Sequence, residues 1–146
     1  MPTTSKPPWL EQLLRLLARF EEVWEEDTEF ISRPGERNDV VCLCARELLS
    51  GQTLRLWRDE LDALGGRPPF RTDDKVVHLG FQYQAEAASY LALGWPIPRK
   101  IIDLSPIFRC LTNGKETPEG KGLIGMQRYC GEIGRASCRE RVCNDV

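Results

Sequence analysis

The middle of the chain alternates apolar and polar residues in the manner of β-strands. This alternation and the β-branched residues predict a hairpin with arms at residues 40–48 and 53–58, joined by a Ser50-Gly51 turn. Further along, residues 75–81 and 101–104 are shorter apolar runs, and we expect strands there as well. The pattern alone therefore predicts four strands in this region.

Apolar residues at helical spacing occur on both sides of these strands. A series of leucines predicts an amphipathic helix within residues 9–20. A second helix is predicted at residues 85–93, where Gly94 ends it, and shorter helices at residues 106–111 and 123–130. Strands that alternate with helices in this way indicate an α/β domain.

The segment between the first helix and the hairpin is strongly acidic. Asp27 and Glu29 stand two positions apart, so on an extended strand both side chains would point from the same face. Paired carboxylates can hold a divalent cation such as Mg²⁺ together with substrate phosphate oxygens. Periodicity leaves two structures open, because a helix continued through Phe20, Val23 and Trp24 fits nearly as well as a strand at residues 23–30.

The stretch Asp27-Thr28-Glu29-Phe30, taken with residues 77–86, 93–98 and 101–104, resembles the DEDD-type 3′–5′ exonuclease domain attached to some bacterial and phage family-A DNA polymerases. The resemblance covers about residues 23–131 and favours the strand at residues 23–30. It implies a ribonuclease H-like α/β fold, in which a mixed five-stranded sheet has flanking helices and is truncated at its C-terminal end.

The resemblance also implies a catalytic site. Asp27 and Glu29 match the first motif, and Glu86 stands at the position of the second motif, where Asp is usual. These three carboxylates are implied to be catalytic residues and ligands of two Mg²⁺ or Mn²⁺ ions, with Asp103 nearby but outside the usual set. The third motif, Tyr-x-x-x-Asp or His-x-x-x-Asp, does not occur in the sequence.

The activity implied is proofreading: hydrolysis of 3′-terminal phosphodiesters of DNA, with the chain as an N-terminal fragment and a polymerase domain following in cis. The alternative is an inactive exonuclease-like module that binds DNA or supports a polymerase. Glu86 in place of Asp, and Glu25 and Glu26 within the strand, favour the alternative. Without the third motif, the 146-residue chain itself is expected to be inactive.

The C-terminal segment has a different character. Residues 132–142 resemble one translated reading frame of a common sequencing adapter, so we expect residues 132–146 to be a non-native tail. A genuine charged tail is the alternative. The expected organisation is a leader with the amphipathic helix at residues 1–22, an incomplete exonuclease-like domain at residues 23–131, and this tail.

Composition fits one soluble domain, with 41% hydrophobic and 29% charged residues and a net charge of −2, but it lacks a strongly basic nucleic-acid footprint. The six cysteines suggest no disulfide framework, and Cys42 and Cys44 have no second pair to complete a zinc site. These features favour a reducing, cytoplasmic setting, and no signal peptide or membrane span is recognised. His78 is expected to be a packed histidine and Tyr129 a core residue.

Overall fold

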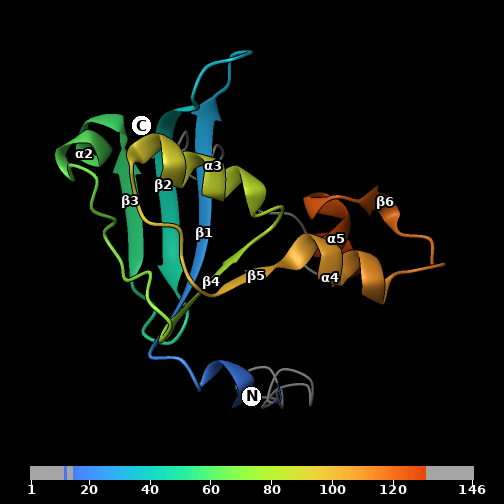
Figure 1. The fold of residues 1–146 in the computed structure, drawn as a ribbon. Coiled ribbons are helices and arrows are strands. Elements are labelled where there is room, and N and C mark those ends of the chain that lie inside the picture. The colour runs from blue at the N-terminus through green and yellow to red at the C-terminus, as the bar shows by residue number, and fades with distance from the viewer. Residues whose placement is uncertain (1–11, 13–14, 131–146) are drawn as a thin grey trace, which may run out of the picture.

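The computed structural model describes residue 12 and residues 15–130, and a five-stranded mixed sheet forms its centre (Figure 1). The strands are β1 (Glu22–Ile31), β2 (Asp39–Glu47), β3 (Thr53–Trp57), β4 (Val76–Gly80) and β5 (Ile101–Asp103), in the spatial order β3-β2-β1-β4-β5. β1, β2 and β3 are antiparallel neighbours, whereas β4 runs parallel to β1 and to β5. The predicted α/β class and mixed five-stranded sheet are confirmed.

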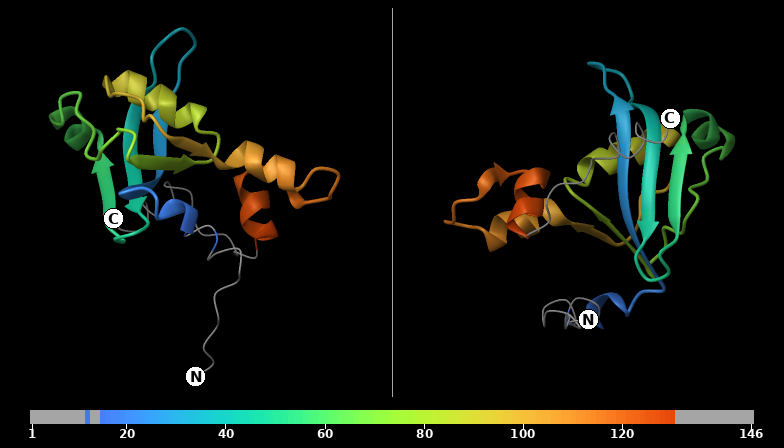
Figure 2. Two further views of the ribbon diagram at one scale, coloured as in Figure 1. Left: turned by 60° about the horizontal axis from the view of Figure 1, so that its bottom comes forward. Right: turned by 180° about the vertical axis from the view of Figure 1, so that it is seen from behind.

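The flanking elements are α2 (Arg58–Ala63), α3 (Gln84–Leu93), α4 (Leu104–Leu111), the short strand β6 (Pro118–Lys121) and α5 (Leu123–Tyr129). α3 crosses one face of the sheet, and α4, β6 and α5 form an arm beyond β5 (Figures 1 and 2). Neither α2 nor β6 was predicted from the sequence pattern. Leu61 is the buried residue of α2, and β6 contains Pro118 and Gly120, so neither element carries a periodic apolar pattern.

The acidic segment is a strand and not a helix: it forms β1, the central strand of the sheet. It pairs with β4 at its start and with β2 along most of its length, so both of its edges lie inside the sheet. Trp24, Glu26 and Thr28 are buried. Glu26 accepts a hydrogen bond from Tyr90 of α3, and Thr28 shares one with Ser89 of α3, so these residues occupy the face that packs on α3. Asp27 and Glu29 belong to the opposite face by the alternation of a strand.

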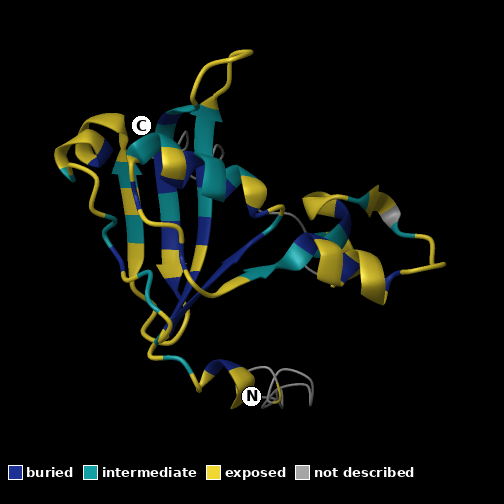
Figure 3. Cartoon of the chain, viewed as in Figure 1, coloured by how far each residue is buried: buried dark blue, intermediate teal, exposed yellow. Residues whose placement is uncertain are grey.

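The larger apolar core lies between the sheet and α3, around Phe70. The ring centroid of Phe70 is 5.2 Å from the ring centroid of Trp24, 6.2 Å from that of Tyr90 and 6.1 Å from that of Trp95. These aromatic residues are buried, and Figure 3 shows the buried stretches of β1, β2 and β4. Burying a Phe side chain contributes about 1.5–3 kcal/mol, so this cluster fastens α3 to the sheet.

A smaller apolar cluster lies on the other face and contains Leu17, Val23, Val77 and Leu79. Leu17 falls in the predicted N-terminal helix, and residues 15–17 are helical. Most of the predicted leader and the predicted tail at residues 132–146 lie outside the described residues. Within the described part of the chain, no helix is both long enough and apolar enough to cross a membrane.

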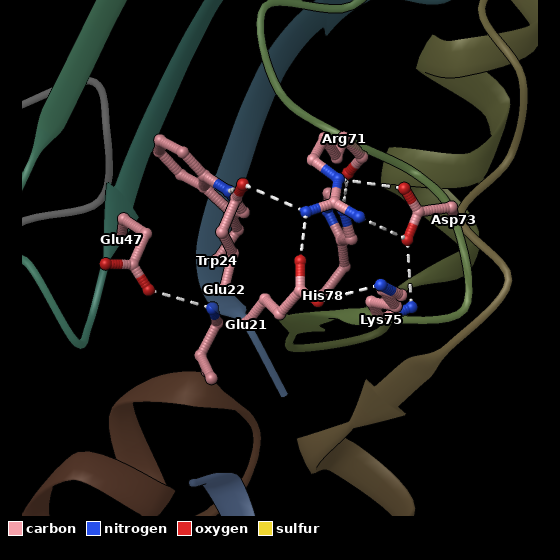
Figure 4. A network of polar contacts seen from close by, with 9 residues as sticks. Glu21, Glu22, Trp24, Glu47, Arg71, Asp73, Lys75 and His78 are labelled. Carbon is pink, nitrogen blue, oxygen red and sulfur yellow. Dashed lines mark hydrogen bonds and ion pairs between the residues drawn. The ribbon is translucent and has the colours of Figure 1, made fainter. Parts of the chain in front are cut away.

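Charged side chains surround the amino ends of β1 and β4 (Figure 4). Arg71 forms ion pairs with Glu21 at 2.5 Å and with Asp73 at 2.8 Å, and Lys75 forms one with Glu21 at 3.0 Å. All four side chains are substantially exposed, so each pair contributes only about 0–1 kcal/mol. This end of the sheet is opposite the end at which the predicted site residues lie.

Glu47, the last residue of β2, links the β2–β3 hairpin to the start of β1 through hydrogen bonds. Its buried carboxylate accepts hydrogen bonds from the backbone N–H groups of Val23 at 2.8 Å, Leu49 at 3.1 Å and Ser50 at 2.5 Å. Burial by itself would raise the pKa of Glu47, but the hydrogen bonds from Ser50, Val23 and Leu49 outweigh burial and lower it. The charged carboxylate is therefore a structural element of the fold.

Candidate active site

The strand order reverses between β1 and β4. From β1 the chain continues to β2 on one side, and from β4 it continues to β5 on the other. The parallel pairing of these two strands ends at Glu25 and Leu79, and Asp27 follows two residues later. In open α/β sheets, ligands bind outside the carboxyl ends of strands at such a reversal. The topology thus places Asp27 where this fold class usually has its site.

Asp27 and Glu29 share one face of β1, opposite Cys44 and Cys42 of β2 respectively. Both carboxylates belong to half-buried residues. The register between β1 and β2 shifts directly after Glu29, which marks a bulge or irregularity. Bulges redirect side chains and are frequent beside active sites. The local structure agrees with the shared face predicted from their spacing.

Glu86 approaches this point from α3. It lies in the first turn of the helix, is 4% exposed, and its Oε2 atom is buried without a hydrogen-bond partner among the described residues. Burial raises the pKa of Glu86 to about 7, helped by the charges of Asp27 and Glu26, while backbone hydrogen bonds at Glu86 itself and Thr28 oppose the rise. The charge of Asp27 therefore acts on Glu86, although α3 packs against the face of β1 opposite to Asp27.

Gly80, the last residue of β4, allows α3 to begin this close to the sheet. A Cβ atom at Gly80 would lie 2.8 Å from Cδ2 of Tyr83 and 3.7 Å from Oε2 of Glu86. The first distance is shorter than a van der Waals contact, so any side chain here would displace the Tyr83 ring or the start of the helix. The glycine thus serves the close packing of β4, Tyr83 and Glu86.

Asp103 fixes the start of α3 from the neighbouring strand. Its carboxylate accepts hydrogen bonds from the backbone N–H groups of Gln82 at 2.9 Å, Tyr83 at 3.1 Å and Ser105 at 2.9 Å. Gln82 has a φ of 60°, a left-handed conformation that non-glycine residues adopt at some cost. Asp103 therefore stabilises the turn before α3 and caps α4, and its nearness to a catalytic site stays a prediction.

A buried polar cluster, formed by Glu26, His78, Tyr83 and Tyr90, lies behind the site. Glu26 accepts hydrogen bonds from the hydroxyl groups of Tyr83 and Tyr90, the latter at 2.7 Å, and its Oε1 is 3.1 Å from Nδ1 of His78. Burial and the Glu26 charge raise the pKa values of both tyrosines far above the ordinary range. Both hydroxyl groups therefore remain protonated donors.

Sequence reasoning missed this cluster, although the sequence carried a signal. Glu26 occupies the same face of β1 as Trp24 and Thr28, so strand alternation itself placed an acidic residue on the buried side. His78 is completely buried, as expected, but it is hydrogen-bonded through both ring nitrogens. The prediction that Tyr129 is a core residue is wrong: Tyr129 is 44% exposed, because α5 lies in the arm beyond the sheet.

The donor set fits a hard cation only in part. Oε2 of Glu86 is a buried carboxylate oxygen without a hydrogen-bond partner among the described residues, and a divalent ion would satisfy it. However, residues 12 and 15–130 contain no group of three or more His, Cys, Asp or Glu side chains arranged to hold a metal ion. The set of Asp27, Glu29 and Glu86 therefore stays a prediction, with the effect of the Asp27 charge on the pKa of Glu86 in its favour.

Comparison with known proteins supports the fold. No family model matches the chain, and no curated protein matches it. A crystal structure of the EXO domain of Nibbler from Aedes aegypti matches with a TM-score of 0.56 and 16% sequence identity, over 88% of this chain and 67% of that chain. At this identity the likeness shows the fold alone, a ribonuclease H-like α/β sheet with flanking helices. Attachment to a polymerase stays a prediction.

Proposed function

We propose that this chain belongs to a metal-dependent 3′–5′ DNA exonuclease, with its site at the carboxyl ends of β1 and β4. The observation that carries the proposal is the buried Oε2 of Glu86, which has no partner among the described residues and lies on a carboxyl group repelled by Asp27. A buried carboxyl group is unfavourable in its charged form, and the negative charge of Asp27 adds to that cost. A divalent cation bound at Glu86 would reduce it.

Asp27 and Glu86 would hold Mg²⁺ or Mn²⁺, and Glu29, on the face of Asp27, would orient water or the terminal 3′-hydroxyl group of DNA. Bound metal would supply Lewis-acid activation of water and stabilisation of the leaving oxygen. The exonuclease-type fold supports a nucleic-acid substrate. A proofreading role and a polymerase domain in cis are implied by the sequence resemblance, and a cytoplasmic setting is suggested by the cysteine content; all three are part of the proposal.

A second candidate function is an exonuclease-like module that binds DNA without hydrolysing it. It is favoured by the lack of a three-ligand group in the described part of the chain and by Glu86 at the usual Asp position. The two functions differ in what Asp27 and Glu86 do. In the enzyme both are required for turnover, whereas in the module neither is.

The test is metal-dependent release of mononucleotides from DNA labelled at its 3′ end, using the natural gene product with any sequence beyond Gly131. Asp27→Asn and Glu86→Gln should each lower the rate by about 10²-fold or more. Asp39→Asn and Glu36→Gln make the same chemical changes at exposed surface ion pairs and should leave the rate within about twofold. DNA binding without any release would establish the module instead.

A further inference from the structure

Glu26 stands directly before Asp27 on β1, and its side chain points to the opposite face of the strand. Glu26 is 4% exposed, and its carboxylate is hydrogen-bonded to side chains from two other elements. His78 comes from β4, and Tyr83 and Tyr90 come from the N-cap and the body of α3. Glu26 therefore connects the strand that carries Asp27 with the helix that carries Glu86.

The two tyrosines lie on either side of Glu86 along the helix. Tyr83, Glu86 and Tyr90 are separated by three and four positions, a spacing that puts all three on one face of α3. Glu26 thus binds this face both before and after Glu86. Thr28 adds a 3.0 Å hydrogen bond to Ser89 on the same side of β1. Sliding or tilting of α3 along β1 would break these bonds.

We propose that Glu26 is a positioning residue, whose hydrogen bonds to Tyr83 and Tyr90 hold α3 against β1 so that the carboxyl group of Glu86 stays beside Asp27. The functional part of this inference rests on the proposed metal-dependent activity. The mechanical part, that Glu26 fixes α3 on β1, does not depend on a metal.

The hydrogen-bond pattern indicates which substitution should preserve this role. Nε2 of His78 is 2.8 Å from the carbonyl oxygen of Arg71, which can only accept, so this nitrogen carries a hydrogen. In Glu26→Gln the side-chain amide has both a donor and an acceptor, so it can keep a hydrogen bond to Nδ1 of His78 and accept one from a tyrosine. Glu26→Leu has a similar size but leaves both hydroxyl groups and Nδ1 without partners.

The experiment measures hydrogen exchange of the α3 amides without metal, and Mn²⁺ affinity, in the natural gene product. Glu26→Leu should increase exchange across residues 84–93 and weaken Mn²⁺ binding about 10- to 100-fold, as is typical for residues that orient metal ligands. Glu26→Gln should restore Mn²⁺ affinity to within about threefold of the parent. Glu25→Leu removes a neighbouring, exposed carboxylate from the same strand and should leave α3 exchange unchanged.

Tyr83→Phe combined with Tyr90→Phe removes the donors but keeps Glu26 and the ring packing, so it serves if Glu26→Leu does not fold. It should also accelerate α3 exchange and weaken Mn²⁺ binding. Unchanged α3 exchange in both Glu26→Leu and the double Phe variant would overturn the inference. Failure of the proposed function looks different: the parent would bind no Mn²⁺ at Asp27 and Glu86, while the changes in α3 exchange would persist.

Discussion

Replacing Glu86 by Gln tests the site through stability as well as through activity. In the folded protein, burial and the charges of Asp27 and Glu26 raise the pKa of Glu86 to about 7 from an ordinary value of 4.5. Below the ordinary value the carboxyl is protonated in both states. As the pH rises toward 7, the unfolded chain releases this proton but the folded chain retains it, so stability falls and the loss is complete above the folded pKa.

The size of this effect follows from the two pKa values. Each pH unit between them corresponds to about 1.4 kcal/mol, so ionised Glu86 lowers the free energy of unfolding by about 3 kcal/mol above pH 7. Gln has nearly the same shape and stays neutral. Without metal, Glu86→Gln should therefore be more stable than the parent by about 1–3 kcal/mol near pH 8, and this gain should approach zero near pH 4.5.

The assay is urea unfolding in EDTA at several pH values, followed by fluorescence of the buried Trp24 and Trp95. Glu36→Gln, in an exposed loop, is the matched control and should change stability by no more than about 0.5 kcal/mol. Near pH 8, Mn²⁺ should stabilise the parent more than Glu86→Gln, because the variant lacks a ligand. A variant of equal or lower stability near pH 8, or a gain independent of pH, would refute the reasoning.

Three further outcomes are expected. Glu47→Gln should lower the free energy of unfolding by about 1–3 kcal/mol at neutral pH. The pKa of Glu47 is lowered from 4.5 in the folded protein, so the difference between variant and parent in urea titrations should shrink as the pH falls through this lowered pKa. Gly80→Ala should cost about 1–3 kcal/mol through its contact with the Tyr83 ring, and an unchanged midpoint in thermal unfolding would contradict this. The 146-residue chain should release mononucleotides at least about 10²-fold more slowly than the natural gene product, because its sequence lacks the third motif; comparable rates would show that the site is assigned wrongly.

The strands and longer helices of the sheet could be predicted because their patterns match their burial. β2 and β3 alternate, β4 is continuously buried, and α3 ends at Gly94, which has a left-handed conformation. α2 could not be predicted, because a six-residue helix with Leu61 as its buried residue has no periodicity. β1 needed the family resemblance, since its acidic residues satisfied a helical pattern nearly as well as an extended one.

The site was predictable in part. The spacing of Asp27 and Glu29 indicates a shared face, but the burial of Glu86 depends on how α3 packs against β1, which no local pattern contains. The partners of Glu26 come from residues 52 to 64 positions away. The unpartnered oxygen of Glu86 is likewise a property of the assembled fold.

Glu26 and Glu86 allow a comparison within one molecule. Both are buried glutamates at the junction of β1 and α3, and each is 4% exposed. The fold surrounds Glu26 with two hydroxyl groups and a histidine nitrogen, which is the usual treatment of a buried carboxylate that serves structure. Glu86, on the contacting helix α3, has an oxygen without a hydrogen-bond partner among the described residues and a pKa raised to about 7. The fold therefore satisfies the first carboxylate more fully than the second, and the negative charges that raise the pKa of Glu86 would favour a positively charged ligand there, as the proposed metal site requires.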